Sequence, residues 1–390
     1  MKAHVCFAAI VSAGAALFSF PAMAACALSG PSVGVTIPGR PYAVAAAADG
    51  CRFYVSYATA APAGAPETNP KPAPGGVALI EFVNGAFAIT RTATFSIQPQ
   101  GMTLSRDGSL LVAPGVEGVA FIDTAKLSRG AADAAAVMEV GGKGPIQASI
   151  TADGKLAFVS VEFSDVVLVI DLVKARANGF KPDAIVGKIP TETQPLGQAL
   201  SPDGKYLYLS VEVAKPKDGL ATPCAEPAGR GNAAAQPSNI PEGLISVIDV
   251  AKAVTDPAHA IIASATAGCR PVRTAISADG RQVYIAARAS RQIVAFDTEA
   301  LRAGKGRSAA LTLPSNAIGE ALSNDGSKLY AGTAEAVSVI ETKSLTVIGR
   351  LPPGPGVGAR EMTMTSGGLL LATSGNRLDI INPASVTPIQ

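Results

Sequence analysis

The chain has 390 residues, of which 16% are charged and 48% hydrophobic, and its net charge is +2. This apolar content excludes a disordered chain, because enough apolar surface is present to form a core. The balanced charge gives no long-range attraction to nucleic acid. With 12 Phe, 7 Tyr and no Trp, few rings are available to stack on single-stranded bases, so we expect no nucleic-acid partner.

The N-terminus is typical of a secretory signal peptide. Lys2 precedes an apolar run over residues 5–20, and small residues follow up to Ala24. We therefore predict a signal peptide at 1–24 and a mature protein at 25–390 that is periplasmic or secreted. No later stretch approaches the roughly 18 to 20 apolar residues of a membrane span, so we expect no transmembrane segment.

A second interpretation of this region is a lipoprotein signal. Ala24 and Ala25 precede Cys26, which would then carry the lipid anchor. Met23 fits that pattern poorly, so cleavage after Ala24 is the favoured prediction.

Four cysteines follow the predicted signal peptide, namely Cys26, Cys51, Cys224 and Cys269. An even number of cysteines in an exported protein predicts disulfides, and four cysteines allow three connectivities. The pairing of sequence neighbours is Cys26–Cys51 with Cys224–Cys269. No Cys-x-x-Cys spacing occurs and His259 is the one histidine after residue 24, so the pattern favours neither a zinc site nor a haem.

Internal repeats determine the predicted architecture. An Asp-Gly turn between two short apolar strands recurs and predicts a β-hairpin, because glycine adopts the positive φ that a tight turn requires. The turns lie at 48–50, 106–108, 152–154, 202–204, 278–280 and 324–326, with a degenerate one at 366–368. A third strand ends on Asp, Glu or Asn at 78–81, 120–123, 168–171, 246–249, 294–297, 338–341 and 379–382. A weaker fourth strand is predicted at 184–187, 260–263 and 345–348.

The spacing of these repeats is typical of a β-propeller. Successive turns are 58, 46, 50, 76, 46 and 42 residues apart. We predict an all-β, single-domain, monomeric seven-bladed propeller of four-stranded antiparallel blades. The N-terminal strand at 33–37 is expected to close the seventh blade. The blades are expected to begin near residues 41, 99, 145, 195, 271, 317 and 359.

The repeat resembles the YVTN-type propeller family, akin to the lactonase-like and cytochrome d1-like propellers. The resemblance is carried by Pro195-Leu196-Gly197, Ser201-Pro202-Asp203-Gly204, Tyr206-Leu207-Tyr208-Leu209 and Ser246-Val247-Ile248-Asp249, and it is echoed from Pro271 to Asp297. It covers roughly residues 33 to 390. A lactonase resemblance implies His, Glu and Arg at the channel mouth. Glu320, Glu361, Arg273 and Arg360 are the catalytic candidates that match in part, whereas no predicted mouth position holds a histidine.

Blades differ from one another just before their first strand, and a site is expected where they differ. These positions predict a polar ring at the channel entrance, where a ligand would bind. The ring consists of Tyr42, Gln100, Gln147, Gln198, Arg273, Glu320 and Arg360, with Glu361 beside it. The alternative is that these groups only line a solvated channel.

A second variable set follows the second strand of each blade. Glu162 and Glu212 occupy equivalent places in blades three and four, and Arg288, Arg291 and Glu335 follow in blades five and six. Glu162 and Glu212 are weak candidates for a shared calcium ion, which prefers several oxygen ligands. The alternative, which the sequence favours, is that they are solvated loop charges.

Two segments interrupt the regular spacing. The insertion at 215–242 accounts for the 76-residue interval, and a Cys224–Cys269 bridge would hold it over the entrance of the fifth blade. A Pro-rich loop at 60–76 is predicted to form a rim segment. Insertions of this length are usually functional or linkers.

Two functions follow from these patterns. The favoured one is a binding scaffold whose channel face holds a small molecule, a glycan or an envelope protein. The alternative is a lactonase-type hydrolase acting through Glu and Arg at the mouth. We expect no resident cofactor, although the hydrolase alternative includes a divalent cation.

Overall fold

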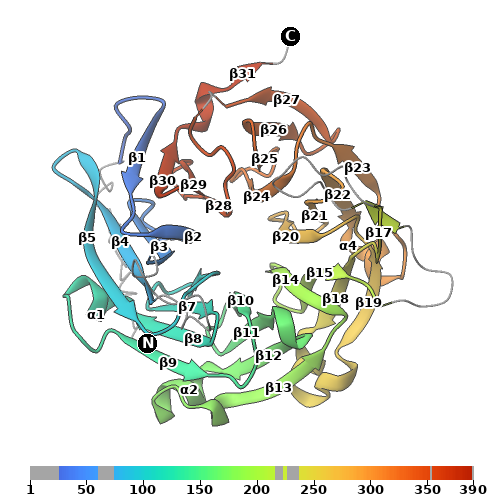
Figure 1. Ribbon diagram of the computed structural model, residues 1–390, viewed down its shortest axis with the longest axis horizontal. Helices are drawn as coiled ribbons and strands as arrows, with labels where there is room; N and C mark the ends of the chain where they lie inside the picture. Colours follow the sequence, from blue (N-terminus) through green and yellow to red (C-terminus); the bar gives the residue numbers. More distant parts are fainter. Residues whose placement is uncertain (1–25, 60–73, 216–222, 226–236, 352–353, 389–390) are drawn as a thin grey trace, which may run out of the picture.

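Seven antiparallel sheets stand in a ring in the computed structural model, which describes residues 26–59, 74–215, 223–225, 237–351 and 354–388 (Figure 1). The predicted seven-bladed propeller is therefore confirmed. The predicted signal peptide lies outside the described residues, as do most of the loop at 60–76 and much of the insertion at 215–242. None of the described helices has the length and apolar character needed to span a bilayer.

Each of the first three blades is built from four consecutive strands. Blade one contains β2 (Arg40–Ala46), β3 (Arg52–Ala58), β4 (Gly75–Val83) and β5 (Ala86–Phe95). Blade two contains β6 (Thr103–Leu104), β7 (Leu110–Gly115), β8 (Gly118–Asp123) and β9 (Ala135–Glu139). Blade three contains β10 (Pro145–Ile150), β11 (Leu156–Val161), β12 (Val166–Asp171) and β13 (Ile185–Pro190).

The next three blades repeat this order with two additions. Blade four contains β14 (Thr193–Leu200), β15 (Tyr206–Val213), β18 (Leu244–Asp249) and β19 (Ile261–Thr266), with the small sheet of β16 (Pro223–Ala225) and β17 (Pro237–Pro241) inserted in the chain between its second and third strands. Blade five contains β20 (Pro271–Ile276), β21 (Gln282–Ala287), β22 (Gln292–Asp297) and β23 (Ala309–Thr312). Blade six contains β24 (Ala317–Leu322), β25 (Lys328–Thr333), β26 (Val337–Glu341) and β27 (Thr346–Arg350), and β31 (Thr387–Pro388) pairs with its outer edge.

The ends of the chain close the ring. Blade seven contains β28 (Met362–Met364), β29 (Leu370–Ser374) and β30 (Arg377–Ile381), and its outer strand is β1 (Ser32–Thr36), as predicted. The sequence did not predict that β31 continues to blade six, where it adds a fifth strand. Both ends of the propeller chain are thus hydrogen-bonded into sheets.

The repeated acids serve the blades, as predicted. In blades two to six the carboxylate of the Asp-Gly turn accepts hydrogen bonds from a serine or threonine hydroxyl and a backbone amide; in blade two the Ser105 hydroxyl donates to Asp107 at 2.5 Å and the Ser109 amide at 3.0 Å. Hydrogen bonds from Ser105 and Ser109 lower the pKa of Asp107 to about 2. The next residue, Gly108, has φ +72°, which explains why glycine recurs there.

In most blades the acid or amide that ends the third strand caps the next turn or helix. Asp123 accepts a hydrogen bond from the Lys126 amide at 2.8 Å, and Asp171, Asp249 and Asp297 do the same for the next helices. These helices are α1 (Thr124–Ser128), α2 (Leu172–Asn178), α3 (Val250–Thr255) and α4 (Thr298–Arg302). The short 3-10 turns are η1 (Glu162–Ser164), η2 (Pro182–Ala184), η3 (Pro257–His259) and η4 (Pro383–Ser385).

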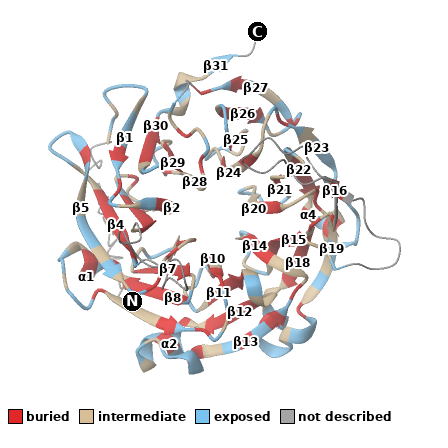
Figure 2. Ribbon diagram, in the orientation of Figure 1, coloured by how far each residue is buried: buried red, intermediate tan, exposed pale blue. Residues whose placement is uncertain are grey.

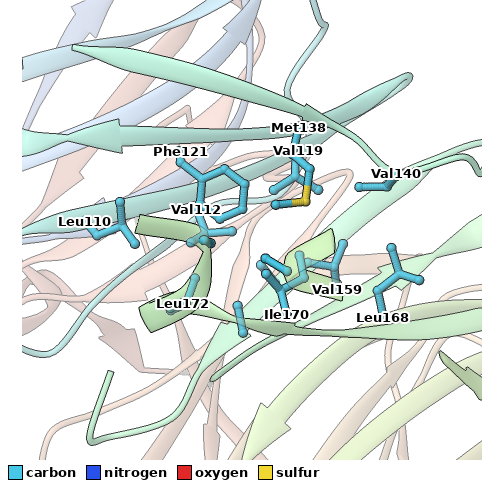
Figure 3. Packing of buried hydrophobic residues seen from close by; sticks show 14 of the residues in the cluster. Leu110, Val112, Val119, Phe121, Met138, Val140, Val159, Leu168, Ile170 and Leu172 are labelled. Atoms are coloured by element: carbon cyan, nitrogen blue, oxygen red, sulfur yellow. The ribbon is translucent and has the colours of Figure 1, made fainter. Parts of the chain in front are cut away.

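The core lies between neighbouring blades. Buried residues gather on the inner and middle strands, whereas the outer strands and helices carry much of the exposed surface (Figure 2). Figure 3 shows one such interface, where Phe121 and Met138 of blade two pack near Leu168 and Ile170 of blade three. Valine, leucine, isoleucine and alanine dominate these interfaces, which accounts for a hydrophobic chain with few aromatic residues.

Both predicted disulfides are present. Cys26 bonds Cys51 and Cys224 bonds Cys269, with Cα–Cα distances of 5.7 and 5.6 Å. These bonds indicate an oxidising compartment. A Cys26 sulfur bonded to Cys51 cannot also carry a thioether-linked lipid, so this disulfide and the lipoprotein interpretation exclude one another.

We expect no reactive thiol in the protein when residues 1–24 have been removed and no reductant has been added. All four remaining cysteines are in disulfides, so a thiol reagent in denaturant should label none before reduction and all four afterwards. Mass spectrometry of the labelled protein measures this. Stoichiometric labelling before reduction would contradict the assignment.

Candidate functional site

The two faces of the propeller differ in what their loops carry. Because neighbouring strands are antiparallel, the Asp-Gly turns between first and second strands lie on one face. The connections from second to third strands, and those entering each first strand, lie on the opposite face. We call this the mouth face, and the insertion after β15 and the disulfide at Cys269 both belong to it.

A β-bulge recurs where the inner strands open onto the mouth face. The register against the second strand shifts between Pro41 and Val44 in blade one, and equivalent shifts occur in blades three to six. A bulge redirects side chains away from the regular alternation. In these five blades it follows the proline or alanine at 41, 145, 195, 271 and 317, and Pro99 and Ala359 occupy the same place in blades two and seven. All seven positions are predicted starts of the blades.

The residues directly after these prolines and alanines form what we call the bulge ring. One comes from every blade, and all seven line a cavity of about 200 Å³ at the mouth end of the channel. The bulge ring consists of Tyr42, Gln100, Ile146, Leu196, Val272, Ile318 and Arg360. Gly101, Gln147, Arg273, Glu162, Glu212 and Arg288 complete the lining.

The predicted polar ring is therefore distributed over three levels of the inner strands. Tyr42, Gln100 and Arg360 belong to the bulge ring. One residue further from the mouth lie Gln147, Arg273 and Glu361, and two residues further lie Gln198 and Glu320. Five of the seven predicted ligand-binding residues line the cavity, whereas Gln198 and Glu320 do not.

The second level crosses the channel. Gln147 Nε2 donates a 3.0 Å hydrogen bond to Glu361 Oε2, and Arg273 Nε lies 3.0 Å from the same oxygen. Arg273 also donates to the backbone carbonyls of Val272 and Arg360, both at 2.9 Å. This cross-channel bridge of Gln147, Arg273 and Glu361 joins blades three, five and seven beneath the bulge ring.

The side chains of the bridge can meet because the inner strands of neighbouring blades approach one another closely. A Cβ atom at Gly197 would lie 2.6 Å from the Cα atom of Arg273 in the next blade. At this level blades two, four and six have glycine, whereas blades three, five and seven supply the three side chains of the bridge.

Glu320 lies behind the bridge and is 6% exposed. Neither of its carboxylate oxygens has a hydrogen-bond partner among the described residues, although Arg273 and the Ala275 amide lie near enough to favour the charged form. Burial nevertheless raises its pKa well above the ordinary value, and Glu361 adds to the rise. Gln198, also beyond the cavity, donates from Nε2 to the Phe158 carbonyl at 2.8 Å.

A cluster of four charged residues stands over the cavity, and we call Glu162, Glu212, Arg270 and Arg288 the mouth cluster. Glu212 is 4% exposed, and its two oxygens accept hydrogen bonds from Arg270 and Arg288, each at 2.9 Å. The expectation that Glu212 is a solvated loop charge is wrong, because two arginines from blade five compensate its burial. Both Glu212 oxygens are thus engaged by arginines, and the described residues contain no cluster of three metal-ligating side chains.

Glu162 belongs to the same cluster but differs in its contacts. It begins η1 after β11, lines the cavity and is only partly exposed. No hydrogen bond or ion pair joins its carboxylate to any residue that the structure describes. Burial raises its pKa to about 7, the nearby charge of Glu212 contributes to the rise, and Arg288 and Arg270 oppose it.

The insertion is anchored beside this cluster. Cys269, bonded to Cys224, directly precedes Arg270, whose backbone has φ +54°. The Cys269 amide donates to the Ser290 hydroxyl at 3.1 Å, in the loop that follows Arg288. The disulfide therefore fixes the segment that presents Arg270 to Glu212. Most of the other residues at 215–242 are not among those that the structure describes.

The other predicted residues lie away from the cavity. His259 stands in η3 on the outer side of blade four, where its ring is 79% exposed and 3.0 Å from Asp256. Arg291 donates to the Pro314 carbonyl, and Glu335 is exposed. Two of the three larger hollows that the described residues form, of about 530 and 550 Å³, lie between blades at the opposite face. We do not regard them as sites, because the repeated turn residues that build every blade line them.

Sequence reasoning missed the apolar half of the bulge ring. Ile146, Leu196, Val272 and Ile318 come from consecutive blades, three to six, and in the sequence their apolar side chains look like those of ordinary strand residues. Their position directly after a repeated proline or alanine is the signal that identifies them. Arg270 was also missed, since only its pairing with Glu212 reveals it.

Comparison with known proteins supports the fold. No protein-family model matches the chain, and no curated protein matches it either. Among solved structures, a chain of the Kuenenia stuttgartiensis hydrazine synthase is similar, with a TM-score of 0.65 and 17% identity. The match covers 92% of this chain and 99% of that chain. At this identity the similarity shows a shared fold alone.

Proposed function

We propose that the protein is a binding scaffold that holds a small organic ligand in the bulge-ring cavity. The observation that carries the proposal is the convergence of one bulge-ring residue from each of the seven blades on one cavity, with the cross-channel bridge beneath it. Ligand sites are typically concave, with an apolar lining and a few convergent polar groups.

The lining has two halves. Ile146, Leu196, Val272 and Ile318 present apolar surface, and Arg360, Tyr42 and Gln100 follow on the next blades of the ring. The Arg360 guanidinium lies 5.3 Å from the centre of the Tyr42 ring, which orders this side of the wall. A ligand with an apolar body and at least one polar group matches this division.

The contacts of the catalytic candidates favour binding over lactone hydrolysis. Arg273 and Glu361 are engaged in the cross-channel bridge, and Glu320 lies behind it rather than in the cavity. Arg360 is the one catalytic candidate in the bulge ring, where it stacks on Tyr42. We therefore propose that the Glu and Arg residues matching the lactonase resemblance have structural roles.

The wider assignment is also a proposal. We propose that residues 25–390 form a single exported domain of YVTN-type repeats, periplasmic or secreted and monomeric. The two disulfides agree with an oxidising compartment. We propose that the insertion at 215–242 borders the ligand site, because its disulfide ends beside Arg270. A partner larger than a small molecule, namely an envelope protein or a glycan, would bind at this same face.

The test is to fill the cavity. We expect a thermal-shift screen of small metabolites on residues 25–390 to give ligands whose affinity falls at least about tenfold in Ile318→Trp, because the indole takes up the space of the ligand. The matched control is Ile262→Trp on outer strand β19, where the side chain is 39% exposed and remote from the cavity lining. Ligands that bind both variants as they bind the wild type would contradict the proposed site.

A further inference from the structure

We propose that the ligand of this cavity carries an ammonium group and that the Glu162 carboxylate receives it. This inference rests on the proposed function and names the chemical class of the ligand. It follows from which charged groups of the cavity already have partners and which do not.

The arginines around the cavity are already engaged. Arg270 and Arg288 share the two oxygens of Glu212, and Arg273 contacts Glu361 and two backbone carbonyls. Arg360 stacks on Tyr42. An anionic ligand would have to compete with these contacts, so four arginines near the cavity do not by themselves make it an anion site.

Glu162 is the lining acid without such a contact in the described part of the chain. Glu212, the other lining acid, has two arginine partners, whereas the Glu162 carboxylate has neither an ion pair nor a hydrogen bond there. A carboxylate partly withdrawn from water without a partner is costly, and an opposite charge that arrives with a ligand removes much of that cost. Glu162 therefore favours a cationic group with hydrogen-bond donors, which an ammonium supplies.

The remainder of the cavity defines the ligand body. Ile146, which is partly buried, and Leu196 lie on blades three and four, the blades that carry Glu162 and Glu212. The apolar half of the bulge ring thus begins in the same blade as Glu162. A compact hydrocarbon body attached to the ammonium would contact this half while its charge faces Glu162.

Binding should also depend on pH. The groups that face Glu162 are Glu212, which raises its pKa, and Arg288 and Arg270, which lower it. With a pKa of about 7, Glu162 is largely protonated at pH 6 and largely ionised at pH 8. An ammonium binds the ionised form, so its affinity should rise about tenfold between these two pH values.

The experiment compares three probes with one ring and different head groups, namely cyclohexylammonium, cyclohexanol and cyclohexanecarboxylate. Their binding to residues 25–390 is measured by titration calorimetry or by NMR at pH 6 and pH 8. We expect cyclohexylammonium to bind best at pH 8. In Glu162→Gln its affinity should fall at least about tenfold and lose its pH dependence, because the amide cannot ionise. Glu335→Gln, an exposed mouth-face acid outside the cavity, is the matched control and should bind as the wild type does.

Three outcomes would overturn the inference. They are tighter binding of the carboxylate than of the ammonium, an unchanged ammonium affinity in Glu162→Gln, and binding of none of the three probes. None of these outcomes by itself contradicts the proposed function. That function is tested by whether any screened ligand loses affinity in Ile318→Trp. A screen that yields only anionic ligands, all lost in Ile318→Trp, would keep the site and reject the ammonium.

Discussion

Glu212→Gln should lower the free energy of unfolding by about 2 to 3 kcal/mol. The Glu212 side chain is 5% exposed and its two oxygens bond two arginines, so the neutral amide removes the negative charge that Glu212 supplies to Arg270 and Arg288. Arg288 is 39% exposed and can turn toward water, which keeps the loss below that of a fully buried pair. Urea unfolding followed by circular dichroism measures the difference.

The control for this prediction is Glu335→Gln, which removes an exposed acid from the same face and should change the free energy of unfolding by less than about 0.5 kcal/mol. The Glu212 effect should also persist in high salt, because a buried pair is screened much less than a surface pair. A Glu212→Gln variant as stable as the wild type would show that the arginines do not depend on this carboxylate, and the mouth cluster would lose its structural role.

Glu320→Gln should change how stability depends on pH. Burial raises the pKa of Glu320 in the folded protein above its value in the unfolded chain, so folding favours the protonated form. The stability that this group contributes is complete below the unfolded pKa and is lost as pH rises toward the folded one. In that range the wild type should lose up to about 1.4 kcal/mol per pH unit through Glu320, whereas the glutamine variant loses none.

Unfolding of both proteins in urea at pH 5, 6, 7 and 8 tests this prediction. Glu162, whose pKa is also raised, is present in both proteins, so its contribution cancels in the difference. We expect the variant to gain stability relative to the wild type as the pH rises from 5 toward the folded pKa of Glu320. A difference that stays constant from pH 5 to pH 8 would mean that Glu320 ionises in the folded protein as it does in the unfolded chain.

The fold could be predicted because its determinants are local and repeated. The Asp-Gly turn needs a carboxylate and a glycine at fixed spacing, and Asp107 with Gly108 shows both. The strand-ending acids, such as Asp123, cap the next helix or turn through a backbone amide three residues away. The strand at 33–37 was predictable because a ring of blades has to close. By contrast, β31 pairs with blade six through a contact between segments distant in the sequence, and no repeated pattern indicates that contact.

The site could be predicted only in part, because the polar residues near the start of each blade were taken as one ring although they stand at different depths. That choice places Gln147 and Glu320 in one ring with Tyr42. Counted from the proline or alanine that begins each blade, Tyr42 is the first residue, Gln147 the second and Glu320 the third, so that Tyr42 lines the wall, Gln147 crosses the channel and Glu320 lies behind it. The pairing of Glu212 with Arg270 and Arg288 joins neighbouring blades, which periodicity within a blade cannot reveal.

The measurement that tests the central claim most directly is a crystal structure of residues 25–390 with a ligand from the thermal-shift screen. We predict electron density for the ligand inside the bulge ring, in contact with Ile146, Leu196 or Ile318 and within hydrogen-bonding distance of Glu162. Density for that ligand only between blades at the Asp-Gly face, or only on the outer strands, would contradict the claim that this propeller binds its ligand at the channel mouth.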